Sequence, residues 1–402
     1  MTIIIQHIRI IDNKPMNDDN NNDNEQHMML PLEVEHYYET NEVDAKNTGF
    51  LDEYKENELP KENPRFKQTK YGLFSLVIFS ALLLFGIRRS SRSPVLRFRF
   101  GTEHHGNNFY YNRTFQIMQI TDIHLGEAEY TDWGPLQDQK TMLLLDTIFA
   151  IEKPDLIVLG GDQLTANNCL QNCTEYYKIL GRFLSNYNIP WATIMGNHDD
   201  MDFEVEDGTG TTIPHSVGLR KELLQTDQRF PLSLSQNSLN NVTGVTNYVL
   251  DVFDPVTDNI SLQIFLLDSG GGSMREAIED DQVQWLRKAA TTDTRTAAVP
   301  AVAFQHIPTY AHQYVDDACF GYQGEGIAGL TYDGGIIDAM TEAGRFHFLA
   351  VGHNHGNDVC VCAYVRNVYS FVIDLFCSHA YIFISKYNIY PKFNRTVLLS
   401  KQ

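Results

Sequence analysis

Short apolar runs alternate with segments of helical spacing from about residue 115 onward. The apolar runs predict buried strands that end at Asp122, Asp162, Asp199, Ser269, Ile307 and Asn354. Between them, apolar residues recur at the three- and four-residue intervals of an amphipathic helix in 140–151, 175–184 and 281–289. Strands that alternate with helices are typical of an α/β architecture, so we predict that fold class for this part of the chain.

The N-terminal region has a different character. Residues 1–70 are rich in acidic residues and asparagine, including the run DDNNNDNE at 18–25, and show no sustained apolar periodicity. Segments of this composition bury too little apolar surface to offset the entropy lost on folding. We therefore expect residues 1–70 to be disordered.

Residues 71–87 (YGLFSLVIFSALLLFGI) carry no charge and are flanked by Lys70 and by Arg88 and Arg89. A helix of this length spans about 25 Å, the short end of what crosses the hydrocarbon core of a membrane. Its distance from the N-terminus argues against a cleaved signal peptide, and its lack of a polar face argues against a buried core helix. We predict a signal-anchor helix at 71–87, followed by a linker at 88–110.

Glycosylation acceptor patterns favour one orientation of this anchor. The pattern N-x-[ST] occurs only after residues 71–87, at Asn112, Asn172, Asn241, Asn259 and Asn394. Basic residues flank both ends of the anchor, so the charge distribution does not choose between orientations. We expect a single-pass type II membrane protein whose C-terminal domain is luminal or extracellular.

Composition limits the partners of the chain. Of its 402 residues 43% are hydrophobic, which is enough for a sizeable core, and its net charge is −20. This charge repels the phosphate backbone of nucleic acids, so no nucleic-acid partner is expected. A small phosphorylated substrate is compatible with the charge if strongly cationic groups line its site. Cys169 and Cys173 leave two readings open, a small disulfide loop and buried free thiols.

Most of the predicted strands end in residues that bind metal ions or transfer protons. In chain order these are D-I-H at 122–124, G-D at 161–162, G-N-H-D at 196–199, His306 and G-H-N-H at 352–355. Ligands of open α/β sheets bind beyond the carboxyl ends of the strands, where these blocks would meet. Two cations about 3.5–4 Å apart, bridged by a carboxylate and held by oxygen and imidazole ligands, bind phosphate esters and acidify a water. Together the blocks indicate a two-metal phosphoesterase.

The order of these blocks resembles that of the calcineurin-like metallophosphoesterase family, whose motifs are D-x-H, G-D, G-N-H-[DE], H and G-H-x-H. Within this family, the stretches MQITDIHLG, LLDSGGG and VAFQHIP are most similar to purple acid phosphatase-like proteins that lack the metal-binding tyrosine. The resemblance implies a domain at 111–358 that folds as a four-layer α/β/β/α sandwich, with two mixed sheets flanked by helices.

The resemblance also implies the ligands of two metal ions, which would be iron, manganese or zinc. The first ion would be held by Asp122, His124, Asp162 and His355. The second would be held by Asp162, Asn197, His306 and His353, with Asp162 as the bridge. His198 would donate a proton to the leaving-group oxygen, with Asp199 as its orienting partner.

Two features depart from the family pattern. Three residues after the bridging aspartate, where the purple enzymes have a tyrosine ligand, this chain has Thr165, and where they have a glycine it has His124. A purple charge-transfer site is therefore not expected, although His124 restores a metal ligand. Residues 359–402 form an atypical tail, for which a divergent pair of strands, a misassembled gene model and a second membrane segment are alternatives.

The sequence thus predicts a membrane-anchored hydrolase that cleaves phosphomonoesters by attack of a hydroxide bound to both metal ions. A phosphodiesterase acting on nucleotides or lipid head groups would use the same blocks and is the closest alternative. A non-catalytic membrane-anchored binding module is the alternative from another class. It is disfavoured because every ligand position holds a competent donor.

Overall fold

The computed structural model describes residues 4–15, 32–36, 94–105, 108–169, 173–204, 211–213, 219–292, 296–313, 320–362 and 381–383. The predicted anchor at 71–87 lies outside these residues. Within the described ranges, no helix combines the length and the apolar character that a membrane span requires.

The first sheet is mixed and has the strand order β2-β1-β4-β5-β6, with β3 paired to β4. Its parallel strands are β4 (Asn108–Thr121), β5 (Leu156–Leu159) and β6 (Trp191–Thr193). Its antiparallel additions are β1 (Ile4–Pro15), β2 (Leu32–His36) and β3 (Arg99–His105).

Three of these strands correct the sequence-based boundaries. The expectation of disorder throughout 1–70 is wrong for β1 and β2, and β3 lies within the expected linker at 88–110. The segment IIQHIRII at the start of β1 is rich in isoleucine, a β-branched residue that favours strands. A composition averaged over the whole acidic region conceals this short run.

The second sheet has seven strands in the order β12-β14-β15-β13-β11-β10-β9. Its central parallel strands are β10 (Ile260–Leu266), β11 (Ala301–Phe304) and β13 (Phe346–Ala350). The others are β9 (Tyr248–Phe253), β12 (Phe320–Gln323), β14 (Asn357–Cys362) and β15 (Tyr381–Phe383). The end of β14 and all of β15 belong to the tail at 359–402, so the described parts of the tail are strands. A small two-stranded ribbon pairs β7 (Phe203–Glu204) with β8 (Thr212–Ile213).

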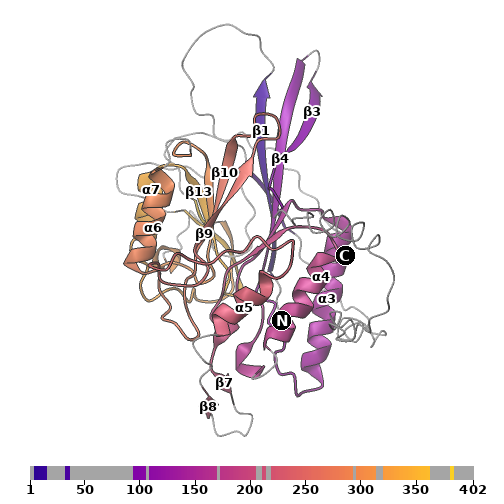
Figure 1. The fold of residues 1–402 in the computed structure, drawn as a ribbon, viewed down its shortest axis with the longest axis vertical. Coiled ribbons are helices and arrows are strands. Elements are labelled where there is room, and N and C mark those ends of the chain that lie inside the picture. The colour runs from indigo at the N-terminus through magenta and orange to yellow at the C-terminus, as the bar shows by residue number, and fades with distance from the viewer. Residues whose placement is uncertain are drawn as a thin grey trace, which may run out of the picture.

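Helices cover the outer faces of both sheets (Figure 1). The helices α3 (Trp133–Ile151) and α4 (Cys173–Ser185) lie on one side of the molecule and α6 (Asp280–Thr291) and α7 (Ile336–Ala343) on the other. The three predicted helices are confirmed as α3, α4 and α6, while α7 and α5 (Leu219–Asp227) were not predicted.

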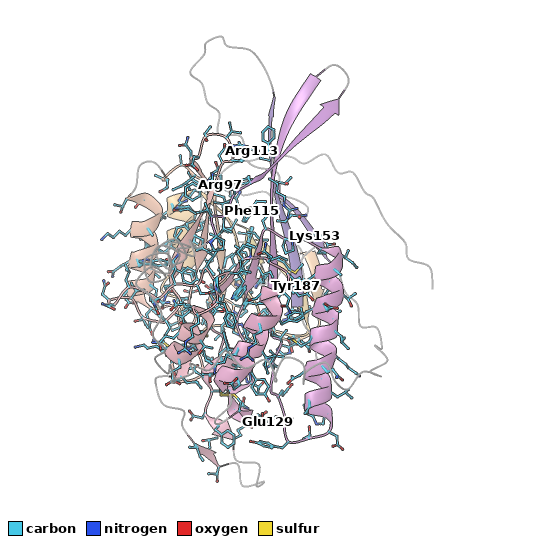
Figure 2. The ribbon with its side chains drawn as sticks, turned by 45° about the vertical axis from the view of Figure 1, so that its right-hand side comes forward. Arg97, Arg113, Phe115, Glu129, Lys153 and Tyr187 are labelled. Carbon is cyan, nitrogen blue, oxygen red and sulfur yellow. A yellow bond between two sulfur atoms is a disulfide. The ribbon has the colours of Figure 1, made fainter. Side chains whose placement is uncertain are left out.

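Apolar side chains alternate between layers along the strands. Phe115 and Ile117 of β4 pack in the core between the two sheets, and Phe115 is fully buried there (Figure 2). Met118 and Ile120 of the same strand pack instead with α3 and α4. A third core lies between the second sheet and the helices α6 and α7. Three cores separate four layers, so the predicted pair of mixed sheets flanked by helices is confirmed.

Candidate metal centre

The predicted site blocks follow the carboxyl ends of parallel strands from both sheets. Asp122 and His124 follow β4, Asp162 follows β5, and the G-N-H-D block follows β6. From the second sheet, His306 follows β11 and the G-H-N-H block follows β13. Because the two sheets pack face to face, these loops meet at one edge of the sandwich, as expected from the sequence.

One group of ligand atoms joins β4 to β13. It consists of Asp122, His124 and His355, whose donor atoms all lie within 4.8 Å of one another. Nε2 of His355 lies 3.3 Å from Oδ1 of Asp122 and 3.3 Å from Nε2 of His124. Two nitrogens bound tetrahedrally to one ion at 2.0–2.1 Å would lie about 3.3 Å apart. The donor set and its spacing therefore fit a transition metal ion.

A second group joins β5 to β11 and β13. It consists of Asp162, His306 and His353, again within 4.8 Å of one another. Nε2 of His306 lies 3.1 Å from Oδ2 of Asp162 and 3.2 Å from Oδ1 of Asn197. The same Oδ2 of Asp162 lies 3.8 Å from Nε2 of His124, which belongs to the first group. Asp162 thus lies between the groups, where a bridging carboxylate would be needed.

The backbone at the centre is strained. Left-handed backbone angles occur at Asp122 (φ 57°), His124 (φ 48°), Asp162 (φ 50°) and His353 (φ 75°). Each such angle costs a residue other than glycine on the order of 1 kcal/mol or more. Hydrogen bonds between the loops that follow β4 and β5 stabilise this strained backbone. The N–H groups of Asp122 and His124 donate to the carbonyls of Gly161 and Asp162 at 3.0 and 3.1 Å. Such strain is typical of positions where the fold must direct a side chain into a site.

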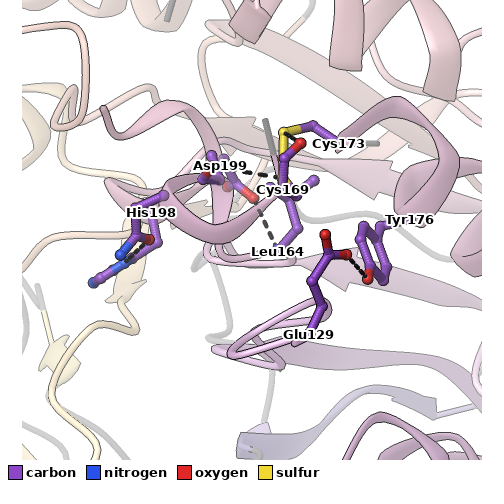
Figure 3. The surroundings of a disulfide bond; sticks show 9 residues. Glu129, Leu164, Cys169, Cys173, Tyr176, His198 and Asp199 are labelled. Atoms are coloured by element: carbon purple, nitrogen blue, oxygen red, sulfur yellow. Dashed lines mark hydrogen bonds between the residues drawn. A yellow bond between two sulfur atoms is a disulfide. The ribbon is translucent and has the colours of Figure 1, made fainter. Parts of the chain in front are cut away.

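Asp199 has a different role from the expected one. Its carboxylate accepts hydrogen bonds from the backbone N–H groups of Asp162 (3.0 Å), Gln163 (2.9 Å), Leu164 (3.2 Å) and Gly196 (2.7 Å). In Figure 3 it points toward Leu164, away from the imidazole of His198. The expectation that Asp199 orients His198 is therefore wrong. Asp199 instead ties together the two loops that carry the G-D and G-N-H-D blocks.

His198 is positioned by other contacts. Its backbone N–H donates to Oδ1 of Asp162 at 2.7 Å, and its Nδ1 lies 3.4 Å from Oδ1 of Asn167. Asn167 belongs to η1 (Ala166–Asn168), a short 3-10 helix. A disulfide between Cys169 and Cys173 follows directly after this helix (Figure 3). Of the two alternatives for these cysteines, a disulfide and buried free thiols, the structure contains the disulfide. The sequence held no signal for Asn167, since nothing in its local pattern marks it.

Thr165 and His124, the two site positions that depart from the pattern of the purple enzymes, contact each other. Nδ1 of His124 lies 3.0 Å from Oγ1 of Thr165, which is buried and occupies the position of the absent tyrosine. For Nε2 to bind a metal ion, Nδ1 must carry the ring proton and donate a hydrogen bond to Oγ1 of Thr165. Thr165 thus orients the imidazole that replaces the lost ligand.

Charges within the centre shift the pKa values of its groups. Burial alone would raise the pKa of Asp162, but the imidazoles of His306, His124 and His198 together outweigh it and hold this pKa well below its usual range. Burial alone would lower the pKa of His306, but the carboxylates of Asp162 and Asp122 outweigh it and raise this pKa to about 9. Burial lowers the pKa of His353 to about 4. Without a metal ion, His306 is therefore protonated at neutral pH and compensates the paired carboxylates.

A buried arginine that the sequence did not indicate supports the G-N-H-D loop. The guanidinium of Arg220, on α5, donates to Asp268 at 2.7 Å and to Asp200 at 2.9 Å. It also donates to the carbonyls of Gly196 and Gly271 at 2.8 and 3.0 Å. Asp268 lies at the end of the predicted strand that ends at Ser269 and carries none of the site blocks, so this strand end supports the centre through Arg220 rather than through a candidate metal ligand.

A cavity of about 730 Å³ opens over both groups. Its lining includes His124, Asp162, His198, His353 and His355. The imidazole of His198 thus lines the same cavity as the candidate metal ligands.

Comparisons with known proteins agree with this geometry. A model of the family described as calcineurin-like phosphoesterase matches residues 115–357. The chain is 24% identical over 323 residues to Probable inactive purple acid phosphatase 28 of Arabidopsis thaliana, covering 72% of this chain and 75% of that protein. It is 26% identical over 275 residues to Phosphatase DCR2 of Saccharomyces cerevisiae, covering 61% of this chain and 45% of that protein. The solved structure of Pseudomonas putida nuclease MPE is 14% identical and covers 56% of this chain and 82% of its own, but its TM-score of 0.20 supports no inference.

Proposed function

Because the chain belongs to the calcineurin-like phosphoesterase family, we propose that it is a metal-dependent phosphatase that hydrolyses phosphomonoesters. The observation that carries this proposal is the complete set of donors in two adjoining groups with Asp162 between them. Every position that the family resemblance assigns to a metal ligand is filled and faces its group. The same donors, oxygen and imidazole, suit iron, manganese or zinc.

The residues divide the work between binding and proton transfer. Two cations bound by these groups would neutralise the phosphate and supply an activated water as the nucleophile. The chain contributes only two carboxylates, Asp122 and Asp162, to the groups, so the loaded site keeps a positive charge that attracts an anion. As the ester bond breaks, its electron pair stays on the alcohol oxygen, and His198 is placed to supply the proton. Asn167 would fix the His198 ring through Nδ1, leaving Nε2 free to donate.

The word "inactive" in the name of the plant relative does not extend to this chain. Loss of the tyrosine ligand removes a purple chromophore, and here the imidazole of His124 occupies the donor group with Thr165 behind it. A non-catalytic protein would be expected to have lost at least one ligand or the proton donor. The described part of this chain retains them all.

Hydrolysis of p-nitrophenyl phosphate by the full chain tests the proposal. We expect activity that a chelator abolishes and added metal restores, and a loss of about 10²–10⁴-fold in kcat for His198→Ala at unchanged metal content. Asn167→Asp is the matched variant that keeps an oxygen acceptor for Nδ1 and should retain most activity. Activity that survives chelation, or full activity of His198→Ala, would contradict the proposal. A higher kcat/KM for bis(p-nitrophenyl) phosphate would replace the monoesterase with the phosphodiesterase alternative.

We also propose that residues 71–87 anchor the chain in a membrane, with the metal centre in the lumen or outside the cell. The disulfide between Cys169 and Cys173 supports this, since disulfides persist in oxidising compartments. Two of the glycosylation acceptors, Asn241 and Asn259, are exposed. A glycosidase-sensitive mobility shift, reduced in Asn241→Gln/Asn259→Gln, and protection from protease in intact microsomes are expected. A domain that protease digests in intact microsomes would refute this orientation.

A further inference from the structure

Outside the metal centre, the lining of the cavity is acidic. We call this part the rim, and its charge disfavours a second anionic group on a substrate. Beyond the candidate metal ligands, the described lining of the cavity includes the exposed Trp133 and Glu204, the half-buried Glu127 and Gln137, and the buried Asn167 and Asn168. No lysine or arginine occurs among the described residues that line the cavity. An anionic phosphate is therefore attracted only by the metal centre, whereas the rim repels any further negative charge on a substrate.

Trp133 gives this rim an aromatic surface. It is the first residue of α3, and 49% of its surface is exposed although tryptophan is usually well buried. The face of an indole ring attracts organic cations, and nearby carboxylates strengthen this attraction. Glu127 and Glu204 line the same cavity as the ring.

The rim is built into the fold. The backbone N–H of Gly126 donates to the carboxylate of Asp138 at 3.1 Å, and that of Ala128 donates to Oδ1 of Asn168 at 3.0 Å. These bonds hold both sides of Glu127, whose carboxylate also accepts from Gln137 at 2.9 Å. A Cβ atom at Gly134 would lie 2.3 Å from the carbonyl oxygen of Ala128, so only glycine lets α3 begin this close to the loop. The start of α3, which carries Trp133, is thus held against the loop that carries Glu127, and both side chains line the cavity before a substrate binds.

We propose that Glu127, Trp133 and Glu204 form a leaving-group subsite, and that the preferred substrates are phosphate esters of alcohols that carry an ammonium group. This inference rests on the proposed function, since the phosphate of such an ester would occupy the metal centre. The ammonium group lies against the Trp133 ring and between the carboxylates, and the phosphate reaches the buried end of the cavity. Esters with a second phosphate on the leaving group are disfavoured by the same carboxylates.

A pair of isosteric esters tests the subsite. Choline phosphate and 3,3-dimethylbutyl phosphate differ only in a quaternary nitrogen that is replaced by carbon, so their shapes match and their charges do not. We expect kcat/KM of the full, metal-loaded chain to be roughly tenfold higher for choline phosphate. One cation–π contact, strengthened by flanking carboxylates, favours the charged ester by about this factor. Calorimetry should show a similar ratio of affinities, which provides a readout that does not depend on turnover.

Variants assign the preference to the subsite. Trp133→Leu, and Glu127→Gln combined with Glu204→Gln, should bring both ratios close to one while leaving inhibition by inorganic phosphate unchanged. Leu136→Ala is the matched control, since Leu136 is exposed on the first turns of α3 but does not line the cavity. Trp133→Phe, which keeps an aromatic face, should retain part of the preference.

The outcomes separate this inference from the proposed function. Hydrolysis of p-nitrophenyl phosphate with equal kcat/KM and affinity for the two esters would overturn the subsite and leave the phosphatase standing. A preference that persists in Trp133→Leu and in the double variant would also overturn it. Tighter binding of choline phosphate that depends on Trp133, without hydrolysis of any ester, would support the subsite and refute the phosphatase. Binding of neither ester, together with no hydrolysis of p-nitrophenyl phosphate, would overturn both.

Discussion

Replacing Thr165 by valine should weaken the first metal site without altering the fold. Valine has the shape of threonine but lacks the hydroxyl that accepts the hydrogen bond from Nδ1 of His124 at 3.0 Å. Only 3% of the surface of Thr165 is exposed, so water has little access to take the place of the hydroxyl. The ring would then either keep a buried donor without a partner or lose the orientation that directs Nε2 at the ion.

The size of this effect follows from the cost of a buried donor without a partner. Such a group costs about 1–3 kcal/mol, which corresponds to a loss of roughly 5- to 150-fold in the affinity for the ion. Partners of metal-bound histidines typically contribute a factor of 10–100, which lies within this range. The hydrogen bond to Thr165 is made by His124 of the first group. The second group, which contains His306 and His353, takes no part in this bond and should bind its ion with unchanged affinity.

Competition with a chromophoric chelator measures the two affinities, and elemental analysis gives the stoichiometry. Thr165→Ser is the matched control, because serine keeps the hydroxyl and should bind metal nearly as the parent chain does. In a His124→Ala background, Thr165→Val should cost nothing further, since both residues act through one ligand. Unchanged affinity in Thr165→Val, or losses that add in the double variant, would refute the role given to this hydrogen bond.

Three further predictions concern the support of the centre. Arg220→Met should destabilise the fold by about 3–5 kcal/mol, because Asp200 and Asp268 are left buried without a counter-charge; a urea midpoint close to that of the parent chain would contradict this. Gly196→Ala should abolish stoichiometric metal binding in elemental analysis, since the added Cβ would lie 2.2 Å from Oδ1 of Asp162 and displace the carboxylate that joins the two groups. In chelator-stripped protein, the raised pKa of His306 stabilises the fold fully below its ordinary pKa of 6.5, and this contribution is lost as pH rises through about 9. The Tm of stripped protein should therefore fall across that window, less so in His306→Gln, and a flat profile in the parent chain would rule the charge pairing out.

The sequence predicted the sheets better than the edges of the domain. The buried strands β5, β10, β11 and β13 and the second half of β4 are short apolar runs bounded by glycine or polar residues, and the local pattern is enough to find them. Strand β1 escaped because its few isoleucines are embedded in an acidic region, and it pairs with β4, a strand remote in sequence. Helices α5 and α7 are too short for a periodic pattern to stand out.

Within the site, the sequence predicted the residues that face the two groups but not the residues that support them. Asn167, Arg220 and Trp133 reach the centre or its cavity from η1, α5 and α3, whose placement depends on packing over the whole domain. The sequence placed Asp199 near the centre but predicted the wrong role for it, because an aspartate next to a histidine suggests an orienting pair. The structure shows that its carboxylate instead accepts from backbone N–H groups on either side of the centre.

This difference has a physical cause in the backbone of the centre. Asp122, Asp162 and His353 adopt left-handed angles that most residues avoid, and a Cβ at Gly196 would overlap Asp162. The G-D, G-N-H-D and G-H-x-H blocks are therefore constrained twice, by the ligand chemistry and by the room that the backbone leaves. Few sequences satisfy both constraints, which is why short blocks are informative. A support such as the one that Arg220 gives to Asp200 and Asp268 is constrained only by charge and distance. Other residues on other elements could provide it, so it leaves no local pattern and becomes visible only once the chain is folded.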